Sequence, residues 1–278
     1  MTSIQSRILT FAVGVPGISA IILFFPQGNH LLFTLFTVVF IYLGSRETAN
    51  LFRQKGYSVP FFVPFSAALF PFLTWTGMHF GISGRLIEYY TVLVLMFILM
   101  REIQNSEDRD FSSSLLRIGA SFTTFFYPAF FSIYAVRITG LEHPGLRLFT
   151  FLILVFANDT AAYIFGSLFG RKSRRLFKAS PNKSLVGFGS GFIVTIIIAA
   201  LIHYLLPVIF TSIYVACAAG VSVGLTAIIG DLAESALKRS AVIKDSGDVI
   251  PGRGGILDSI DSIIFSAPLY FLILNYFS

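Results

Sequence analysis

The chain has 278 residues, of which 55% are hydrophobic and 12% are charged, with a formal net charge of +6 at pH 7 and a mean hydropathy of +0.80. Because soluble globular domains carry charge on about a quarter of their residues, this composition excludes an ordinary soluble domain. It predicts an all-α, polytopic integral membrane protein. The single cysteine, Cys217, lies in an apolar segment, which excludes a disulfide framework and a cysteine-based metal site.

Apolar segments close to the length of a membrane span recur along the whole chain. We expect about nine transmembrane helices in one membrane domain, with little recognisable chemistry in residues 1–140 and a functional site in residues 141–278. Prolines in the first half, including Pro16 and Pro128, indicate kinks or helix ends. The nine segments are 8–25, 31–44, 60–76, 86–100, 115–136, 147–169, 187–207, 210–232 and 256–276.

Basic residues predict the orientation of the chain in the cell's inner membrane. With a cytoplasmic N-terminus and an outer C-terminus, only Arg85, Arg137 and Arg147 of the 20 Lys and Arg residues fall on the outer side. The basic loops 170–186 and 238–255 then share the cytoplasmic face. The positive charge is thus an orientation signal and a surface for anionic headgroups and nucleotide, and nucleic acid is not expected as a partner.

Acidic residues stand at the mouths of the last two apolar segments. Asp231, Glu234 and Lys238 follow at i, i+3 and i+7, which places them on one stripe of a helix, and Asp258 and Asp261 repeat the i, i+3 spacing on the next helix. A carboxylate at membrane depth costs about 2.5 to 3.5 kcal/mol unless it is paired. We therefore expect the two stripes to face each other and to hold a divalent cation. The alternative is a set of helix-end carboxylates solvated at the membrane surface.

The link between these two helices has the sequence SGDVIPGRGGI. Its glycines and its proline cannot continue either helix. Its backbone N–H groups are expected to cradle an anion beside the metal, so the predicted ligand carries phosphate.

These acidic and basic residues resemble the signature of the phosphatidate cytidylyltransferases, also called CDP-diacylglycerol synthases. That signature runs S-x-x-K-R, four residues, K-D, and a Gly/Pro loop that ends H-G-G-x-x-D-R-x-D. The chain departs from the family at Arg253, where His is usual, and at Ser259, where Arg is usual. The matching residues here are Ser235, Lys238, Arg239, Lys244, Asp245, Gly254, Gly255, Asp258 and Asp261.

Two further stretches resemble the same family, so that the resemblance covers about residues 150–265 and leaves residues 1–140 divergent. In the first stretch, Asp159 and Tyr163 follow an Asn; Asp159 is either a hydrogen-bond anchor inside the bundle or, as we favour, part of a polar cavity open to the cytoplasm. In the second, Ser180 predicts a cap or turn before a helix whose N-terminus, with Lys183, suits a phosphate. The alternative is a lipid-facing basic loop. Val186 replaces the family's Glu.

The resemblance implies that CTP and phosphatidate react to CDP-diacylglycerol and pyrophosphate, in phospholipid biosynthesis. The expected cofactor is Mg²⁺, and a second cation is left open. Asp231 and Asp258 are the leading metal ligands in this interpretation, and Asp261 is a third ligand or orients the others. Glu234 is expected to hold these ligands in place without touching the metal.

The other predicted roles follow from the need to neutralise negative charge, because the reaction brings two anions together and expels a third. Lys238, Asp258 and Asp261 are expected to be catalytic, together with Arg253, which we expect to have taken over the phosphate contact of the Arg that is missing at Ser259. The predicted substrate-binding residues are Asp159, Tyr163, Ser180, Lys183, Arg239, Lys244, Asp245, Gly254 and Gly255.

Two alternatives to this function stay open at the level of sequence. One is a catalytically impaired or substrate-shifted relative that binds nucleotide or lipid, and the other is a transporter whose intramembrane acids form an ion path.

Two small-xxx-small patterns, Gly187 with Gly191 and Gly220 with Gly224, permit close approach of neighbouring helices. Whether two copies form a homodimer is also left open.

Overall fold

The computed structural model describes residues 3–82, 85–104, 111–170, 173, 177–181, 183–250, 252 and 254–277, with side chains from residue 12 onward. Across these residues, ten α-helices and one short 3-10 helix account for the regular structure. The all-α prediction is confirmed. The helices are α1 (Ser3–Phe24), α2 (Gln27–Gln54), α3 (Phe62–His79), α4 (Arg85–Gln104), α5 (Ser114–Phe126), α6 (Ala129–Arg137), η1 (Ile138–Gly140), α7 (Pro144–Phe169), α8 (Leu185–Leu205), α9 (Ile213–Ser240) and α10 (Leu257–Phe277).

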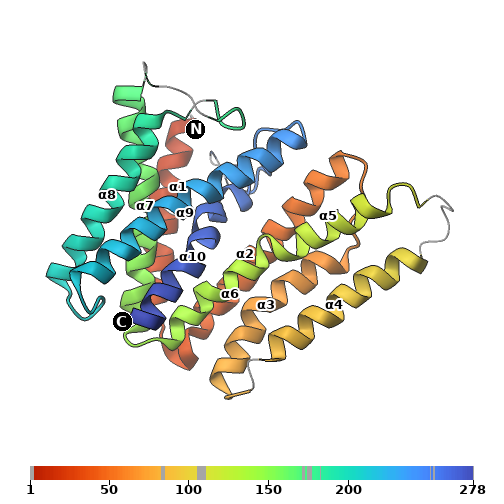
Figure 1. Cartoon of the computed structure of the whole chain (residues 1–278), viewed down its shortest axis with the longest axis horizontal. Coiled ribbons are helices and arrows are strands. Elements are labelled where there is room, and N and C mark those ends of the chain that lie inside the picture. Colours follow the sequence, from red (N-terminus) through yellow and green to blue (C-terminus); the bar gives the residue numbers. More distant parts are fainter. Residues whose placement is uncertain are drawn as a thin grey trace.

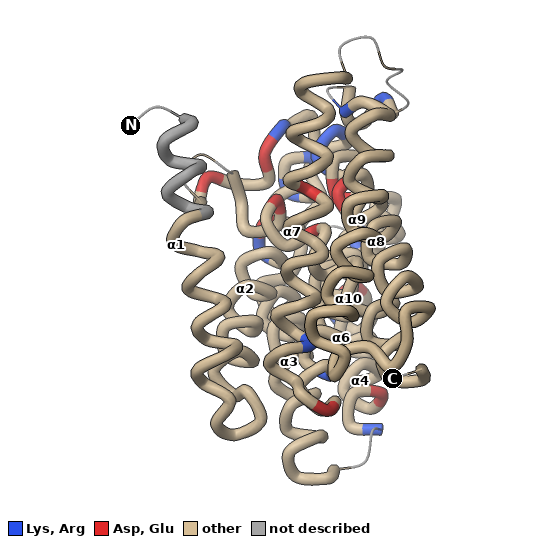
Figure 2. Tube along the Cα trace, turned by 90° about the vertical axis from the view of Figure 1, so that its left-hand side faces the viewer, with Lys and Arg blue, Asp and Glu red and all other residues tan. Residues whose placement is uncertain are grey.

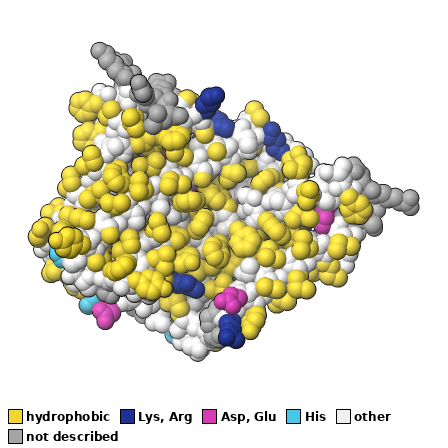
Figure 3. Space-filling view, in the orientation of Figure 1, with side chains coloured by type: hydrophobic (Ala, Val, Ile, Leu, Met, Phe, Trp, Pro, Cys, Tyr) yellow, Lys and Arg dark blue, Asp and Glu magenta, His cyan; other side chains and the backbone are white. Residues whose placement is uncertain are grey.

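The nine predicted segments coincide with these helices, except that the fifth is divided between α5 and α6. The break falls at Tyr127 and Pro128, since proline has no N–H to donate to the preceding turn. Within the described residues, five helices are long and apolar enough to cross a membrane, namely α2, α7, α8, α9 and α10. Hydrophobic side chains cover most of the face in Figure 3, as expected for a surface that meets lipid.

The helices form two groups that meet along α10 (Figure 1). Helices α1, α7, α8 and α9 lie on one side, and α2 to α6 lie on the other. Each group is centred on a hydrophobic core, and α10 contributes to both; Phe33 of α2 and Ala135 of α6 also enter the core of α1, α7 and α9. Ile260 and Ile264 are buried in the core of α2, α3, α5 and α6, whereas Ala267, Tyr270 and Leu274 are buried in the core of α1, α7 and α9. Helix α10 therefore fixes the position of one group relative to the other.

Glycines let α8 pack closely between α7 and α9, as the small-xxx-small patterns predicted. A Cβ atom on Gly187 would lie 2.8 Å from the carbonyl oxygen of Ala162 in α7. On the other side, a Cβ on Gly220 of α9 would lie 2.8 Å from Cα of Ile196. Since real Cβ atoms do not approach this closely, any larger residue would push these helices apart.

Charged residues gather toward the end of the bundle where the N-terminus lies (Figure 2). At that end, α2 and α9 continue well beyond the apolar segments, α2 to Gln54 and α9 to Ser240. The corresponding predicted spans end at residues 44 and 232, because hydropathy falls there. The extensions carry Glu47 and Lys238, so they bring charged groups to the end of α10.

Candidate active site

Both acidic stripes have the predicted helical register. Asp231, Glu234 and Lys238 lie on α9, and Asp258 and Asp261 lie in the first turns of α10. The link, taken from here on as the whole segment between Ser240 and Leu257, is not helical in its described residues, as its glycines and proline predicted. The two helices pack against each other, so the acids of one helix face those of the next.

Three of these carboxylates form a compact group. Asp231, Glu234 and Asp261 each offer one oxygen, and these oxygens all lie within 4.8 Å of one another. Glu234 is fully buried and Asp261 is 5% exposed. Carboxylate oxygens are the preferred protein ligands of divalent cations such as Mg²⁺ and Ca²⁺. The geometry and the chemistry of this acidic group therefore fit a metal ion.

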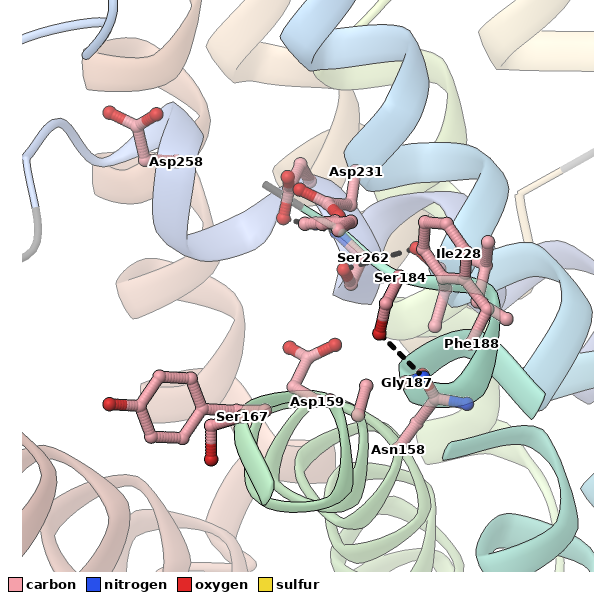
Figure 4. Close-up of a pocket in the computed structure, with 16 residues that line it drawn as sticks. Asn158, Asp159, Ser167, Ser184, Gly187, Phe188, Ile228, Asp231, Asp258 and Ser262 are labelled. Carbon is pink, nitrogen blue, oxygen red and sulfur yellow. Dashed lines mark hydrogen bonds and ion pairs between the residues drawn. The ribbon is translucent and has the colours of Figure 1, made fainter. Parts of the chain in front are cut away.

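A cavity of about 340 Å³ opens beside the acidic group, between α7, α8, α9 and α10. Figure 4 shows the carboxylate of Asp159, on α7, pointing toward the region of Asp231, with Asp258 lying apart from both. The preference for Asp159 in a polar cavity is thus supported by its position. The ionisable side chains and the tyrosine of the lining are those of Asp159, Tyr163, Lys183, Asp231, Asp258 and Asp261.

Lys238 joins the acidic group to Asp258. Its ammonium lies 2.6 Å from a carboxylate oxygen of Glu234 and also contacts the carboxylate of Asp258. The Lys238 side chain is 11% exposed, so this ion pairing takes place largely out of water. A largely buried cation thus links Glu234 of α9 to Asp258 of α10.

Asp258 turns toward the link. One of its oxygens accepts hydrogen bonds from the backbone N–H of Ser246 at 2.8 Å, the Ser246 hydroxyl at 2.9 Å and the backbone N–H of Gly255 at 2.8 Å. The other oxygen contacts Lys238. The structure thus brings Asp231 and Asp261 together with Glu234, and it places Asp258, the other predicted leading ligand, where it fastens the link.

The predicted anion cradle is wrong for three amides of the link, and the first amide of α10 is occupied in the same way. Two of them, those of Ser246 and Gly255, donate to Asp258. The N–H groups of Ile256 and Leu257 donate to the carboxylate of Glu47, at 2.9 and 2.8 Å. These amides face carboxylates of the chain itself because the link folds back onto the ends of α2 and α10.

Glu47 was not predicted from the sequence. This residue lies on α2 and is 6% exposed, and it also accepts a hydrogen bond from the Ser246 hydroxyl at 2.8 Å. No spacing signal marks it, since it stands beside Arg46 in a segment that looks like a solvated cytoplasmic helix end. Its buried partners lie about 200 residues further along the chain.

Gly254 and Gly255 were predicted to let a nucleotide approach the backbone. In the structure the close approach is made by carboxylates. A Cβ on Gly254 would lie 2.7 Å from Asp258 Oδ2, and one on Gly255 would lie 2.7 Å from Glu47 Cδ. Gly254 also has a φ of +112°, which an L side chain rarely adopts. Both positions therefore need glycine for the folding of the link itself.

Asn158 serves as the anchor inside the bundle. It is 1% exposed, and its Nδ2 donates to Thr195 Oγ1 at 3.2 Å and to the carbonyl oxygen of Gly224 at 3.3 Å. These bonds join α7 to α8 and α9. Both neighbouring residues line the cavity, and Asn158 in addition ties α7 to the rest of the bundle.

The segment before α8 brings a cation to the cavity. The side chain of Ser184 caps α8 by accepting the N–H of Gly187 at 3.1 Å, whereas Ser180 takes part in the turn that precedes the cap. The ammonium of Lys183 contacts the carboxylate of Asp231. Burial lowers the pKa of Lys183, and the nearby Asp261 opposes that shift. Lys183 thus lies beside the acidic group, where it balances part of its charge.

Six of the nine predicted substrate-binding residues lie outside the cavity lining. Besides Ser180, Gly254 and Gly255, they are Arg239, Lys244 and Asp245. Lys244 and Asp245 are exposed on the link. Arg239 is also exposed, and it donates to the carbonyl oxygens of Ala179 at 3.3 Å and Ile243 at 3.2 Å. Arg239 therefore connects the loop before α8 to the link, which places both basic loops on one face.

The three departures from the family pattern are placed as follows. Arg253 lies outside the described residues. Val186 is 38% exposed in the first turn of α8. Ser259 donates to the carbonyl oxygen of Gly255 at 3.2 Å and lines an apolar cavity of about 320 Å³ on the other face of α10, beside Ile260. Ser259 is thus separated by α10 from the cavity that holds the acids.

Comparison with known proteins identifies the family to which the chain belongs. A sequence profile described as "Cytidylyltransferase family" matches residues 5–277, which is nearly the whole chain. The chain belongs to the cytidylyltransferase family. It is accordingly a nucleotidyltransferase, and the transporter alternative is set aside. The match includes the first half of the chain, where no motif was recognised in the sequence.

Two of the similar proteins described next carry the name of a cytidylyltransferase, and the third is uncharacterized. A phosphatidate cytidylyltransferase of Staphylococcus saprophyticus is 30% identical over 265 residues, covering 92% of this chain and 96% of its own. One of Bacillus subtilis is 29% identical over 255 residues, covering 87% and 90%. The uncharacterized protein YnbB of Escherichia coli is 39% identical over 138 residues, which are 50% of this chain and 45% of its own length.

Proposed function

We propose that the protein transfers the cytidylyl group of CTP to phosphatidate, forming CDP-diacylglycerol and releasing pyrophosphate. The observation that carries the proposal is the acidic group of Asp231, Glu234 and Asp261 beside a polar cavity, in a chain that matches the family over residues 5–277. The names of the Staphylococcus and Bacillus relatives support the choice of substrates.

The acidic group is the proposed Mg²⁺ site. Four carboxylates, those of Asp231, Glu234, Asp258 and Asp261, lie close to the ammonium groups of Lys183 and Lys238. Two ammonium groups leave an excess of negative charge in this set, to which Asp159 on the cavity wall adds, and a bound divalent cation would offset part of that excess. Glu234 thus takes the ligand place that the sequence-based interpretation gave to Asp258, while Asp231 and Asp261 keep theirs.

The chemistry needs charge neutralisation more than a strong base. A phosphate monoester has a second pKa of about 6, so the phosphate of phosphatidate is largely ionised at neutral pH. One of its oxygens attacks the α-phosphorus of CTP, the bond to the bridging oxygen breaks, and pyrophosphate leaves with that electron pair. Bound Mg²⁺ would supply positive charge at the phosphate oxygens. Lys183 can add a fixed cation there, since it lies on the cavity wall.

The decisive experiment is Mg²⁺-dependent turnover by the purified protein. We expect labelled CTP to enter a lipid product only when phosphatidate and Mg²⁺ are both present, and chelation with EDTA to reduce the rate at least about 100-fold. Phosphatidylglycerol vesicles without phosphatidate are the control for the acceptor. Binding of CTP without turnover would indicate an impaired or substrate-shifted relative, and turnover at full rate in EDTA would contradict the metal assignment.

The proposed orientation places the N-terminus and both basic loops in the cytoplasm. In a Cys217→Ser background, cysteines at Lys178 and Asp248, which are exposed in the two loops, should resist a membrane-impermeant thiol reagent added from outside. A cysteine at the exposed Glu142, between η1 and α7, should be labelled. Labelling of the two loop cysteines in intact cells, with Glu142→Cys protected, would invert the topology.

A further inference from the structure

Glu47, on α2, is buried against the link and the start of α10. The reaction proposed above gives this carboxylate no role. Its two oxygens accept the N–H groups of Ile256 and Leu257, at 2.9 and 2.8 Å, and the hydroxyl of Ser246, at 2.8 Å. The first N–H groups of a helix have no partner within the helix, and the helix dipole favours negative charge there. A carboxylate from the first half of the chain therefore caps the helix that carries Asp261.

The link is shaped around this carboxylate. A Cβ on Gly247 would lie 2.8 Å from Glu47 Oε1, and one on Gly255 would lie 2.7 Å from Glu47 Cδ. Two glycines thus leave the space into which Glu47 inserts. The contact is a built feature of the fold, because a side chain at either glycine would expel the carboxylate.

Ser246 connects Glu47 to the site. Its hydroxyl lies 2.8 Å from Glu47 Oε2 and 2.9 Å from Asp258 Oδ2, and Asp258 contacts Lys238, which pairs with Glu234. A continuous series of polar contacts therefore runs from α2 to the acidic group. Groups of this kind, which hold metal ligands without touching the metal, typically change metal affinity or activity by about 10- to 100-fold when they are replaced.

We propose that Glu47 is a positioning residue of the active site. It fixes the link and the start of α10, and so sets where Asp258 and Asp261 stand relative to α9. The proposal rests on the proposed function, since it assigns Glu47 a part in the same reaction. It gives the first half of the chain a direct role in the site.

The test replaces Glu47 by Gln, which keeps the volume but turns an NH2 group toward at least one N–H or O–H donor. We expect kcat to fall about 10- to 100-fold and the half-saturating Mg²⁺ concentration to rise. Peptides covering residues 254–260 should exchange their amide hydrogens faster. A loss of stability alone would lower the folded fraction without moving the Mg²⁺ concentration that half-saturates the remaining enzyme.

Glu102→Gln is the matched control. Glu102 is also a largely buried carboxylate in the first half, with its side chain 14% exposed and paired with Arg117 at 2.5 Å, but it lines a separate cavity near α3 and α5. The same substitution there should leave the Mg²⁺ dependence and the exchange of residues 254–260 unchanged. Wild-type kcat and Mg²⁺ dependence in Glu47→Gln would overturn the proposal, even if exchange became faster.

A second variant covers the case in which Glu47→Gln does not fold. Ser246→Ala removes only the bridging hydroxyl, and it should raise the half-saturating Mg²⁺ concentration in the same direction; wild-type behaviour would overturn the proposal. Should the unaltered protein show no turnover, the proposed function fails by itself. Protection of residues 254–260 by Mg²⁺ in the wild type, and its loss in either variant, would then still decide whether Glu47 positions the site.

Discussion

Replacing Asp261 by Asn is expected to abolish turnover, with a loss well above the 10- to 100-fold typical of a residue that only supports a metal ligand. Asp261 is 5% exposed, and its oxygen lies within 4.8 Å of those of Asp231 and Glu234. The substitution keeps the size of the side chain and removes one charge from the proposed metal site. The protein should stay inserted and folded, because fewer like charges then share the same buried space.

The measurement is the initial rate of labelled CTP incorporation as a function of Mg²⁺ concentration. The wild type and the variant are compared at equal amounts of membrane-inserted protein. Asp248→Asn serves as the control, because Asp248 is an exposed aspartate on the same link and has no part in the proposed site. Its rate should stay within about twofold of the wild type, as expected for an exposed position. Near-normal turnover in Asp261→Asn would rule out the metal site as assigned.

Asp258→Asn separates the ligand set predicted from the sequence from the one that the geometry favours. If Asp258 fastens the link, as its bonds to Ser246 and Gly255 indicate, its substitution should lower the rate more than it alters the Mg²⁺ requirement. Asp231→Asn should alter that requirement directly. Equal shifts of the Mg²⁺ dependence in both variants would favour the pair of ligands that the sequence predicted.

Hydropathy and spacing were sufficient for much of this fold. Nine apolar segments predicted the helices of the bundle, and the i, i+3 spacing placed Asp231 and Glu234 on one face of α9. The two stripes were expected to meet because a glycine-rich link joins neighbouring helices. These features depend on local sequence, where the periodicity of a helix determines which side chains share a face.

The contacts of the link could not be predicted from local sequence. Asp258 and Asp261 have the same spacing as the acids of α9, yet one turns to the link and the other joins the acidic group. The link that receives Asp258 also contacts Glu47, whose helix arrives from a distant segment of the chain and supplies the acceptor for Ile256. Spacing reports the face of a helix, whereas the partner of each side chain depends on tertiary packing.

The helix extensions were missed for a related reason. Residues 45–54 of α2 and 233–240 of α9 are too polar to count as a span, although both helices continue through them. Buried ion pairs and hydrogen bonds stabilise these turns where hydropathy does not. Glu47 on one extension and Lys238 on the other are largely buried, which shows that the polar ends belong to the packed structure.

Lys238→Met is expected to have the largest effect on stability. The ammonium of Lys238 pairs with Glu234 at 2.6 Å and contacts Asp258, with its side chain 11% exposed. Removing one partner of a buried ion pair leaves an uncompensated charge and costs about 3 to 5 kcal/mol. For a chain of this size that corresponds to a fall in melting temperature of roughly 10 °C. Turnover should be lost as well.

The apparent melting temperature in detergent, measured at one scan rate, gives the first readout. Lys178→Met is the matched control, because Lys178 is exposed on the loop before α8 and its charge is solvated by water. That variant should melt within about 2 °C of the wild type, since exposed substitutions change stability by about 0.5 kcal/mol or less. Equal melting of both lysine variants would contradict a buried role for Lys238.

A double variant separates stability from catalysis. Without the ammonium, Asp258 keeps three hydrogen-bond donors from Ser246 and Gly255, whereas the fully buried Glu234 loses its cation. Glu234→Gln in the Lys238→Met background should therefore restore most of the melting temperature, because residue 234 then carries no charge and Asp258 keeps its hydrogen-bond donors. Turnover should stay lost, since a proposed ligand and a fixed cation are both missing. Recovery of turnover together with stability would show that this pair acts on folding alone.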